Sequence, residues 1–427
     1  MNNQPLPAPE RPPHSVYYRW ELLLLLFFTY FLHQADRAIF GIVLPSIKTD
    51  LKLTDTQIGV SGTVLFLVLA VMVPAGGMLG DRLSKKWIIT GSLIFWSIST
   101  MLTGVSRGLA GLIAFRSVAT GGGESFYGPA STALIAAFHK KTRALALSIH
   151  QSSLYIGIMV SGFLAAWVSQ QFGWRSTFYI FGGCGLLLGG VLVFRLRDPR
   201  AGETEISAQE SAQPLPPLEA VRTLVRIPTA LLLTVGFTAI VFVNNAYLVW
   251  APMFIGAKFG VPEITAGGFS MFYHHLAALA GVLIGGAVAD AVVPRRPRFR
   301  LQLQATAMLC GVPLIFLIGR VNSLAAIWIV IALFGFVRGL YESNTHAAMF
   351  DVVPPRLRST VVGLMIMCAF LIGSLSPLLL GMLGDHYGTA SGLGAGFSGL
   401  SLAWLIGGLC IVAALVFTYN RDRLKNT

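Results

Sequence analysis

The chain has 427 residues, of which 55% are hydrophobic and only 11% are charged. An ordinary soluble protein carries about 25% charged residues, so this composition excludes a soluble fold and indicates a membrane protein with many spans. The formal net charge of +13 does not indicate binding to nucleic acid, because the basic residues gather in the segments between apolar stretches.

The first predicted segment, residues 1–19, is a polar, proline-rich cytoplasmic tail that we expect to be disordered. Six apolar stretches follow within residues 20–197 and six more within residues 226–420. Each is long enough for a helix to cross a hydrocarbon core of about 30 Å. Between the two series, residues 198–225 are rich in Pro, Ser, Glu and Gln, which predicts a flexible cytoplasmic linker. Residues 421–427 form a second, short cytoplasmic tail.

This pattern predicts an all-α polytopic membrane protein with twelve transmembrane helices in two six-helix bundles. With the N-terminus placed in the cytoplasm, the cytoplasmic segments hold 22 of the 31 Lys and Arg residues, the opposite side holds 6 and the spans hold 3. This asymmetry follows the positive-inside rule and predicts a multi-pass protein of the inner cell membrane with both termini cytoplasmic. The expected spans are residues 20–46, 56–79, 86–105, 109–138, 143–170, 174–197, 227–256, 265–290, 301–320, 324–352, 358–383 and 396–419.

Six charged residues lie inside the predicted spans, beginning with an adjacent acid and base in the first span. Insertion scales place the cost of one such residue at a helix centre at about 2.5–3.5 kcal/mol, so six unrelieved charges would cost roughly 15–20 kcal/mol. That exceeds the net stability of a typical domain, ~5–15 kcal/mol. We therefore expect these residues to be paired, neutralised or in contact with a wet cavity. They are Asp36, Arg37, Arg116, Glu124, Arg338 and Glu342.

Helical geometry predicts how some of these charges are oriented. Asp36 and Arg37 are adjacent and point about 100° apart, so we expect them to serve different neighbours. Arg338 and Glu342 are four residues apart in the tenth span, and His346 follows four residues later. Residues at this spacing lie along one stripe of a helix.

The two halves of the chain resemble each other. The segment GGMLGDRLSKK follows the second span and GGAVADAVVPRR follows the eighth, and both contain Gly-x-x-x-Asp, ending at Asp81 and Asp290. Glu124 in GGGESFYGP and Glu342 in RGLYESNTH form a second match at nearly the same offset. Such matches indicate a duplicated six-helix unit. In transporters, repeats of this kind enclose a site near the bilayer midplane, and rocking of one repeat against the other gives alternating access.

The segment GGMLGDRLSKK, following the second of twelve spans, resembles the loop motif of the major facilitator superfamily. The Asp-Arg pair of the first span, the GES of the fourth and GWRSTFYIFGG of the sixth are similar to bacterial spinster-like transporters. They are equally similar to the neighbouring anion:cation symporters of sugar acids. In both groups an arginine usually precedes the fourth-span glutamate by seven residues, whereas Arg116 precedes Glu124 by eight. The resemblance covers roughly residues 16–420 and implies two pseudo-symmetric bundles.

The resemblance also implies roles for individual residues. Residues of the loop motif lock one conformation in the family, which assigns a gating role to Gly77, Asp81, Arg82, Lys85 and Lys86, with Asp290 as their counterpart in the second half. Spans that line the cavity in the family contain two adjacent polar pairs of this chain. These pairs are His150–Gln151 and Asn244–Asn245.

The chemistry of the intramembrane charges fits the movement of an anion together with protons. Intramembrane carboxyls form proton relays, which makes Asp36 and Glu124 candidates for proton coupling. Arginine keeps its proton in proteins, so it suits steady binding of a carboxylate or phosphate. The alternative is that all six charges form static ion pairs that hold the bundle together. The substrate-binding candidates are Arg37, Arg116, His150, Gln151, Asn244, Asn245, Arg338 and Glu342.

We therefore expect a secondary active transporter, coupled to protons, for a small organic anion such as a sugar acid or another carboxylate. The second hypothesis is a spinster-like carrier of lysophospholipid or sphingoid phosphate, and the third is efflux of drugs or cations. An enzyme or a channel is disfavoured, since the sequence holds no assembled catalytic set and the duplication fits a rocking bundle. We expect no metal and no cofactor beyond the proton gradient. The expected partners are the substrate and the lipid bilayer, without nucleic acid, and the chain is expected to be a monomer.

Overall fold

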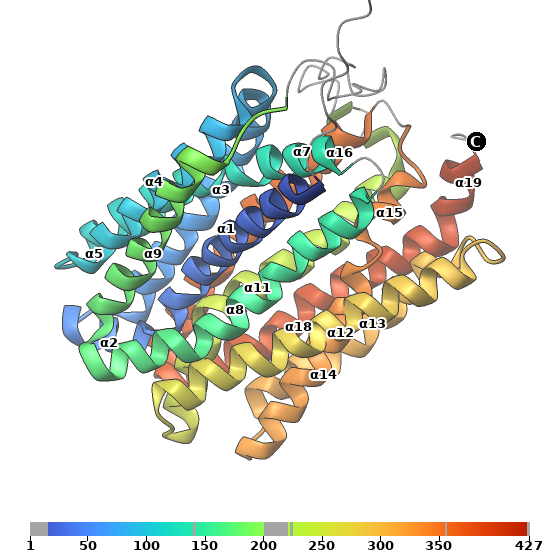
Figure 1. Ribbon diagram of the computed structural model, residues 1–427. Coiled ribbons are helices and arrows are strands. Elements are labelled where there is room, and N and C mark those ends of the chain that lie inside the picture. The colour runs from blue at the N-terminus through green and yellow to red at the C-terminus, as the bar shows by residue number, and fades with distance from the viewer. Residues whose placement is uncertain (1–15, 140–141, 200–220, 223–224, 355–356, 425–427) are drawn as a thin grey trace, which may run out of the picture.

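The computed structural model describes residues 16–139, 142–199, 221–222, 225–354 and 357–424. All regular elements within these residues are helices, and the long ones run side by side along one bundle (Figure 1). Eleven helical segments of the described part are long and apolar enough to cross a membrane. Most of the predicted linker and of the N-terminal tail, and the last three residues of the C-terminal tail, lie outside the described residues.

The helices of the first half belong to the first six expected spans. They are α1 (Val16–Ile42), α2 (Leu44–Leu51), α3 (Asp55–Arg82), α4 (Lys85–Gly104), α5 (Leu109–Gly111), the π-helix η1 (Leu112–Ala119), α6 (Thr120–Glu124), α7 (Tyr127–Phe138), α8 (Arg143–Phe172) and α9 (Trp174–Arg195).

The helices of the second half belong to the other six expected spans. They are α11 (Pro228–Phe259), the π-helix η2 (Ile264–Gly268), α12 (Phe269–Val292), α13 (Phe299–Arg320), α14 (Leu324–Glu342), α15 (Thr345–Phe350), α16 (Arg358–Gly373), α17 (Leu375–Tyr387), α18 (Thr389–Ala413), the π-helix η4 (Ala414–Thr418) and α19 (Tyr419–Leu424).

Within the described residues, the fourth expected span, residues 109–138, is divided into more pieces than any other. It is divided into α5, η1, α6 and α7, so none of its pieces reaches the length of a span by itself. The break begins at a π-helix, a form that is rare and is frequently found at functional sites. This span carries two of the six intramembrane charges.

Several helix ends differ from the expected boundaries for local reasons. The first expected span continues to residue 46, but α1 ends at Ile42, and α2 follows with Pro45 in its first turn, where the missing N–H of proline costs nothing. Gly388 has φ +83° and precedes α18, which begins at Thr389 rather than at residue 396. Glycine adopts this left-handed conformation without strain. α1 and α19 also extend a few residues into the segments predicted as tails.

Two glycines of α14 set its distance from α12. A Cβ placed on Gly335 would lie 2.1 Å from the backbone oxygen of His274, and one on Gly339 would lie 2.1 Å from that of Ala278. No real side chain tolerates such contacts, so glycine is required for this close approach, as is common between membrane helices. The packing holds Arg338, the residue before Gly339, next to α12.

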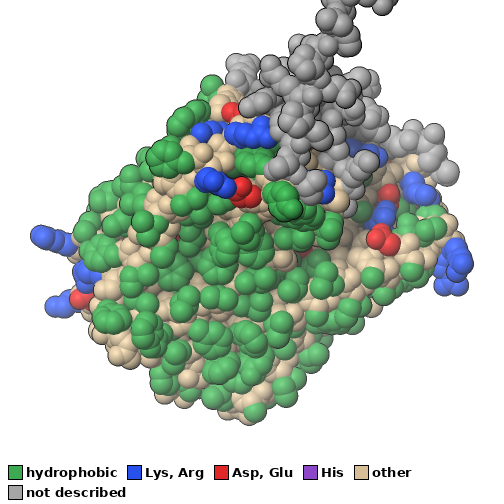
Figure 2. All heavy atoms as spheres, viewed as in Figure 1, with side chains coloured by type: hydrophobic (Ala, Val, Ile, Leu, Met, Phe, Trp, Pro, Cys, Tyr) green, Lys and Arg blue, Asp and Glu red, His purple; other side chains and the backbone are tan. Residues whose placement is uncertain are grey.

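The bundle has a hydrophobic belt between two charged ends. Figure 2 shows hydrophobic side chains covering most of one face, whereas Lys, Arg, Asp and Glu gather toward opposite ends of it. We call the end where α9 stops and α11 begins the linker end, and the opposite end, which carries α2 and η2, the far end (Figure 1). A belt of this kind is what a lipid bilayer requires of a spanning protein.

Candidate functional site

The six intramembrane charges form three pairs, each of one arginine and one acid, as the cost of burying single charges predicts. The pairs are Arg37–Glu124, with a nitrogen–oxygen distance of 2.7 Å, Arg116–Asp36 at 3.3 Å and Arg338–Glu342 at 3.3 Å.

Arg37 and Glu124 form the shortest of these pairs. Nε of Arg37 donates to Oε2 of Glu124, whose side chain is fully buried. Gln34 lies 3.1 Å from Nδ1 of His33, and Nε2 of the same imidazole lies 3.3 Å from the backbone oxygen of Glu124. With the Gln34 amide donating to Nδ1, the proton of His33 is on Nε2 and points at Glu124. The pair therefore joins α1 to α6 with a histidine as third partner.

Asp36 is bonded on both carboxylate oxygens. The hydroxyl of Thr100 donates to Oδ1 over 2.8 Å, and Nη1 of Arg116 lies 3.3 Å from Oδ2. Nη2 of Arg116 also donates to the backbone oxygen of Asp36 over 3.0 Å. Asp36 and Arg37 thus bind different neighbours, which is the arrangement that their 100° separation predicted. Thr100, on α4, was not among the predicted site residues.

The π-helix η1 explains how Arg116 and Glu124 both reach α1. Eight residues of regular α-helix would leave the two side chains about 80° apart, whereas seven would leave them about 20° apart. A π-turn accommodates one additional residue, and η1, which contains Arg116, lies between α5 and α6. The extra residue relative to the family spacing is therefore absorbed by the backbone, and both side chains face α1.

The third pair lies in the second half and is less enclosed. Nη2 of Arg338 lies 3.3 Å from Oε2 of Glu342, and Nη1 donates to Nε2 of His274 over 3.0 Å. The Glu342 side chain is 30% exposed, compared with 0% for Glu124. His346 does not continue the stripe on one helix, since α14 ends at Glu342 and His346 lies in the separate helix α15, although it still faces Glu342.

Tyr155 connects this pair to the other half of the molecule. It lies on α8, and its hydroxyl donates to Oε2 of Glu342 over 3.3 Å. α8 belongs to the first half and α14 to the second, so this bond crosses between the halves. The sequence shows Tyr155 only as a polar residue inside a span, which does not identify its partner.

The two polar pairs suggested by the family resemblance lie elsewhere. His150 is buried, its Nε2 lies 2.9 Å from the hydroxyl of Tyr127, and its ring stacks on Tyr30 at 4.7 Å. Gln151 is exposed on α8. Oδ1 of Asn244 and Nδ2 of Asn245 are buried and have no hydrogen-bond partner among the described residues. Within the described residues, no hydrogen bond joins these four residues to the charged pairs.

The predicted gating motif is only partly described. The surroundings of Gly77 and the side chains of Asp81 and Arg82 are outside the described part of the structure. Lys85 and Lys86 begin α4, where the backbone N–H of Lys86 donates to Asp198 over 3.0 Å. Asp290 is exposed near the end of α12.

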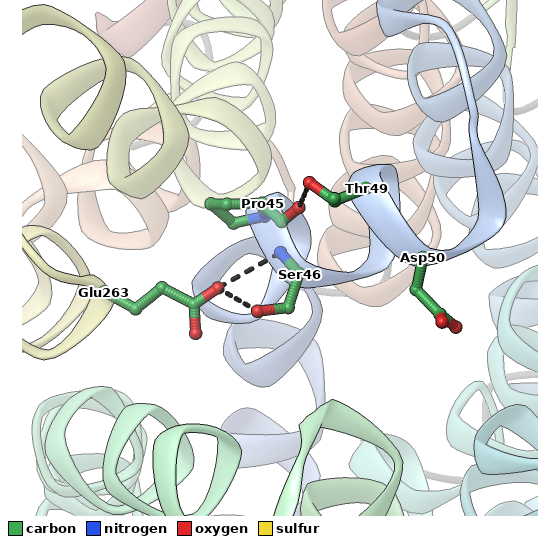
Figure 3. Close-up of a pocket in the computed structure, with 5 residues that line it drawn as sticks. All are labelled: Pro45, Ser46, Thr49, Asp50 and Glu263. Atoms are coloured by element: carbon green, nitrogen blue, oxygen red, sulfur yellow. Dashed lines mark hydrogen bonds between the residues drawn. The ribbon is translucent and has the colours of Figure 1, made fainter.

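A group of polar contacts at the far end joins the two halves, and the sequence did not suggest it. We call it the far-end clasp; it consists of Ser46, Lys48, Asp55, Ser169, Glu263, Asp385 and Thr389. Oε1 of Glu263 accepts from the N–H and the hydroxyl of Ser46, as Figure 3 shows, and Oε2 accepts from Ser169 over 3.0 Å. Glu263 precedes η2, whereas both serines belong to the first half. The only sequence signal was an acid in a short loop between apolar stretches.

The rest of the clasp fixes the start of α3. Asp385 accepts from the backbone N–H groups of Asp55 and Thr56 over 2.8 and 2.9 Å. These N–H groups belong to the first turn of α3, where a carboxylate is favoured by the helix dipole. Lys48 bridges Asp55 and Thr389 over 2.6 and 2.9 Å. Because Asp385 and Thr389 belong to the second half, this cluster also holds the halves together.

Asp50 lies beside the clasp but does not take part in it. It lines the same pocket as Pro45, Ser46, Thr49 and Glu263, and in Figure 3 its side chain points away from Glu263. Arg175 and Trp174, both on α9, donate to its carboxylate. The hydrogen bond from Arg175 lowers the pKa of Asp50, so this exposed acid is ionised at neutral pH.

Comparison with known proteins identifies the family to which the chain belongs. The model of the Major Facilitator Superfamily matches residues 26–377. That range contains all three charged pairs and all the predicted motif residues. It ends before Asp385 and Thr389.

Three relatives and one solved structure cover most of the chain. Protein spinster homolog 1 of Xenopus tropicalis is 27% identical over 392 residues, 87% of this chain and 73% of that protein. An MFS-type efflux pump of Mycolicibacterium smegmatis is 26% identical over 408 residues, 92% of each chain. A D-galactonate transporter of Escherichia coli is 25% identical over 400 residues, 88% of this chain and 91% of that one.

The solved structure is a bacterial homolog of the human lysosomal transporter Spinster, crystallised in an inward-facing and unoccupied conformation. It matches with a TM-score of 0.82 and 23% identity, over 96% of this chain and 99% of that one. At this level of identity, the match confirms the predicted fold and carries no statement on substrate.

Proposed function

Because this chain belongs to the Major Facilitator Superfamily, it is a transporter rather than an enzyme, and we propose that it moves a small organic anion by proton-coupled alternating access. The observation that carries the proposal is the set of three arginine–acid pairs in an otherwise apolar bundle. Each pair combines a permanent cation, which suits an anionic substrate, with a carboxyl that can take up a proton.

We assign proton coupling to Asp36 and Glu124. Both carboxylates are buried and each contacts an arginine, at 3.3 and 2.7 Å. Protonation of either acid would remove its attraction for the arginine and free the guanidinium for another anion. The competing explanation, in which both pairs only hold α1 against the fourth span, requires that neutralising the acid leaves coupling intact.

A sugar acid or another carboxylate is the substrate class that we favour. The likeness to the D-galactonate transporter supports it. The second candidate is a lysophospholipid or sphingoid phosphate, which the resemblance to spinster proteins favours and whose phosphate suits the same arginines. Efflux of drugs or cations is the third candidate, supported by the relative described as an efflux pump.

The remaining expectations complete the proposal. The protein is a multi-pass membrane protein, and we place it in the inner membrane with both termini in the cytoplasm and as a monomer. We assign gating to the loop motif with Asp81 and to Asp290. The proton gradient is the proposed energy source, and no cofactor or metal is required.

The coupling proposal is tested by transport in proteoliposomes. We expect a pH gradient to drive accumulation of D-galactonate by the wild-type protein and Asp36→Asn to reduce it at least tenfold, because the amide cannot carry a proton. Asp50→Asn, which neutralises an exposed acid at the far end, serves as the matched control and should keep the wild-type rate. Undiminished coupled transport by Asp36→Asn would remove the carrier role of Asp36. Transport of lysophosphatidylglycerol but not of D-galactonate would favour the second candidate.

A further inference from the structure

The Arg338–Glu342 pair has the geometry of a contact that can be exchanged. One oxygen of Glu342, Oε2, accepts from both Nη2 of Arg338 and the hydroxyl of Tyr155, each over 3.3 Å. Charge-assisted hydrogen bonds that are well formed measure about 2.7–2.9 Å. The side chain is also 30% exposed. Glu342 is therefore held loosely and can leave its two donors for water at little cost.

Arg338, in contrast, is held in place without Glu342. Its side chain is buried, and Nη1 donates to Nε2 of His274 over 3.0 Å. Since arginine can only donate, Nε2 accepts and the imidazole is neutral, with its proton on Nδ1. The ring of His274 stacks on Tyr247 at 4.4 Å, and the Tyr247 hydroxyl donates to the backbone of Ser270. The guanidinium thus keeps its position when Glu342 leaves.

Departure of Glu342 would leave a buried cation without a counter-charge. Nε of Arg338 has no hydrogen-bond partner within the described residues, and His274 offers no negative charge. An uncompensated buried charge is strongly unfavourable. Another anionic oxygen is thus needed in the place of Oε2. Arg338 and Tyr155 are both donors there, and they can offer to that oxygen the two bonds that Glu342 now receives.

We propose that Arg338 and Tyr155 form the subsite for the anionic oxygen group of the substrate, a carboxylate or a phosphate, and that Glu342 occupies this subsite until the substrate arrives. This inference rests on the proposed function, since it takes the substrate to be an anion. His274 is the positioning residue that keeps Arg338 in place. Substrate binding then requires Glu342 to move into water or to take up a proton from it, so the second half has its own link between protons and substrate.

The surroundings of Glu342 make Arg338 its dominant charged partner. The titratable and charged groups that face the pair come from several elements. They are His346 on α15, Tyr30 on α1 and Tyr155 on α8, which face Glu342, and Tyr247 on α11 and His274 and His275 on α12, which face Arg338. Tyr341, on α14 itself, also lies near Glu342. On α13, Arg300 is committed to Asp351, with distances of 2.7 and 2.9 Å. Within the described residues, Arg338 is thus the one cation in contact with Glu342.

The test is direct binding to the purified full-length protein, measured by titration calorimetry at pH 5.5 and 7.5. The probe is D-galactonate, with D-galactose as the uncharged counterpart. For the wild type we expect tighter binding of D-galactonate at pH 5.5 than at pH 7.5, because a carboxyl that has taken up a proton no longer competes for Arg338. Glu342→Gln should bind it at least fivefold more tightly at pH 7.5 and lose most of the difference between the two pH values. Glu21→Gln, which neutralises a partly exposed acid paired with Arg195, is the matched control and should resemble the wild type.

Two further variants address the donors. Arg338→Gln in the Glu342→Gln background should remove the gain in affinity, and Tyr155→Phe should weaken binding severalfold without abolishing it. Glu342→Ala replaces Glu342→Gln if the latter fails to fold, and it should act in the same direction. A parallel titration with lysophosphatidylglycerol identifies the source of the anionic group, because a gain restricted to the lipid points to a phosphate headgroup and a gain restricted to D-galactonate points to a carboxylate.

The outcomes separate this inference from the proposed function. If the wild type binds an anion but Glu342→Gln leaves both affinity and pH dependence unchanged, the subsite is elsewhere and the anion-transport proposal stands. If D-galactose gains affinity as much as D-galactonate does, charge is not what Glu342 competes for, and the inference fails. If neither the wild type nor Glu342→Gln binds either anion, the inference and the proposed substrate class fail together.

Discussion

The two halves of this transporter pair their intramembrane charges in different surroundings. In the first half, two pairs lie in the protein interior, and their acids also contact Thr100 and His33 of the same half. In the second half, the single pair is partly exposed and contacts Tyr155 across the interface between the halves. A buried pair holds its own helices together, whereas an exposed pair at an interface can change partners. Burial should therefore determine how much each pair stabilises the fold.

The largest effect expected from this comparison is on the buried pair Arg116–Asp36. Arg116→Gln removes the cation and leaves Asp36 buried, and breaking a buried pair in this way typically costs about 3–5 kcal/mol. We expect a clear fall in the midpoint of thermal unfolding in detergent. Arg338→Gln is the matched control, since Glu342 is 30% exposed and can be hydrated when its partner is lost.

The control should therefore lower the midpoint by much less than Arg116→Gln does. Equal losses from the two variants would contradict the idea that the halves differ. A smaller fall in the unfolding midpoint from Arg116→Gln at low pH would sharpen the contrast between the halves, because a protonated Asp36 no longer needs its partner.

How far the sequence predicts this arrangement depends on whether a feature is local. The cost of unpaired charges predicts that six ionisable residues must find partners, and the 100° step along a helix predicts that Asp36 and Arg37 diverge. The four-residue spacing of Arg338 and Glu342 likewise predicts their contact. Each of these conclusions uses only helix geometry and the solvent properties of a bilayer.

Features that depend on the backbone path were not predictable in the same way. The π-helix at Arg116 changes which side chains share a face, and the end of α14 places His346 in a separate helix; neither has a reliable local signal. Tyr155 and Glu263 find their partners on the other half of the chain, so only the tertiary structure identifies them. The sequence therefore predicted that the charges must be paired, neutralised or wet and that Arg338 and Glu342 share a stripe, but not the partners of the other four charges or the contacts between the halves.

Those contacts give a second prediction, of intermediate size, at the far-end clasp. Glu263→Gln removes a carboxylate that accepts from Ser46 and Ser169, and hydrogen bonds to a charged group contribute about 1.5–3 kcal/mol each. Even the lower figure shifts an equilibrium roughly tenfold. We expect the variant to populate a conformation that is open at the far end.

The measurement is the distance between spin labels at Thr49 and His386, two exposed far-end residues on different halves, in a background without native cysteines. Asp50→Asn serves as the control, because the hydrogen-bond partners of Asp50 within the described residues, Trp174 and Arg175, both belong to the first half. If Glu263→Gln leaves the distance distribution unchanged, the clasp does not decide which end is closed.

The smallest effect is expected from an exposed pair, Arg175–Asp50, whose side chains are 37% and 45% exposed. Exposed ion pairs contribute about 0–1 kcal/mol, so Arg175→Gln should shift the unfolding midpoint only slightly at pH 7. Arg175 lowers the pKa of Asp50, so whatever stability the pair contributes is present above the ordinary pKa of about 3.9. It is lost as the pH falls through the lowered value.

The difference between the Arg175→Gln variant and the wild type should therefore vanish in strong acid, and also in about 1 M salt, where the Debye length is about 3 Å. A loss at pH 7 as large as that of Arg116→Gln would show that burial does not rank these pairs, and the contrast between the halves would then need another cause.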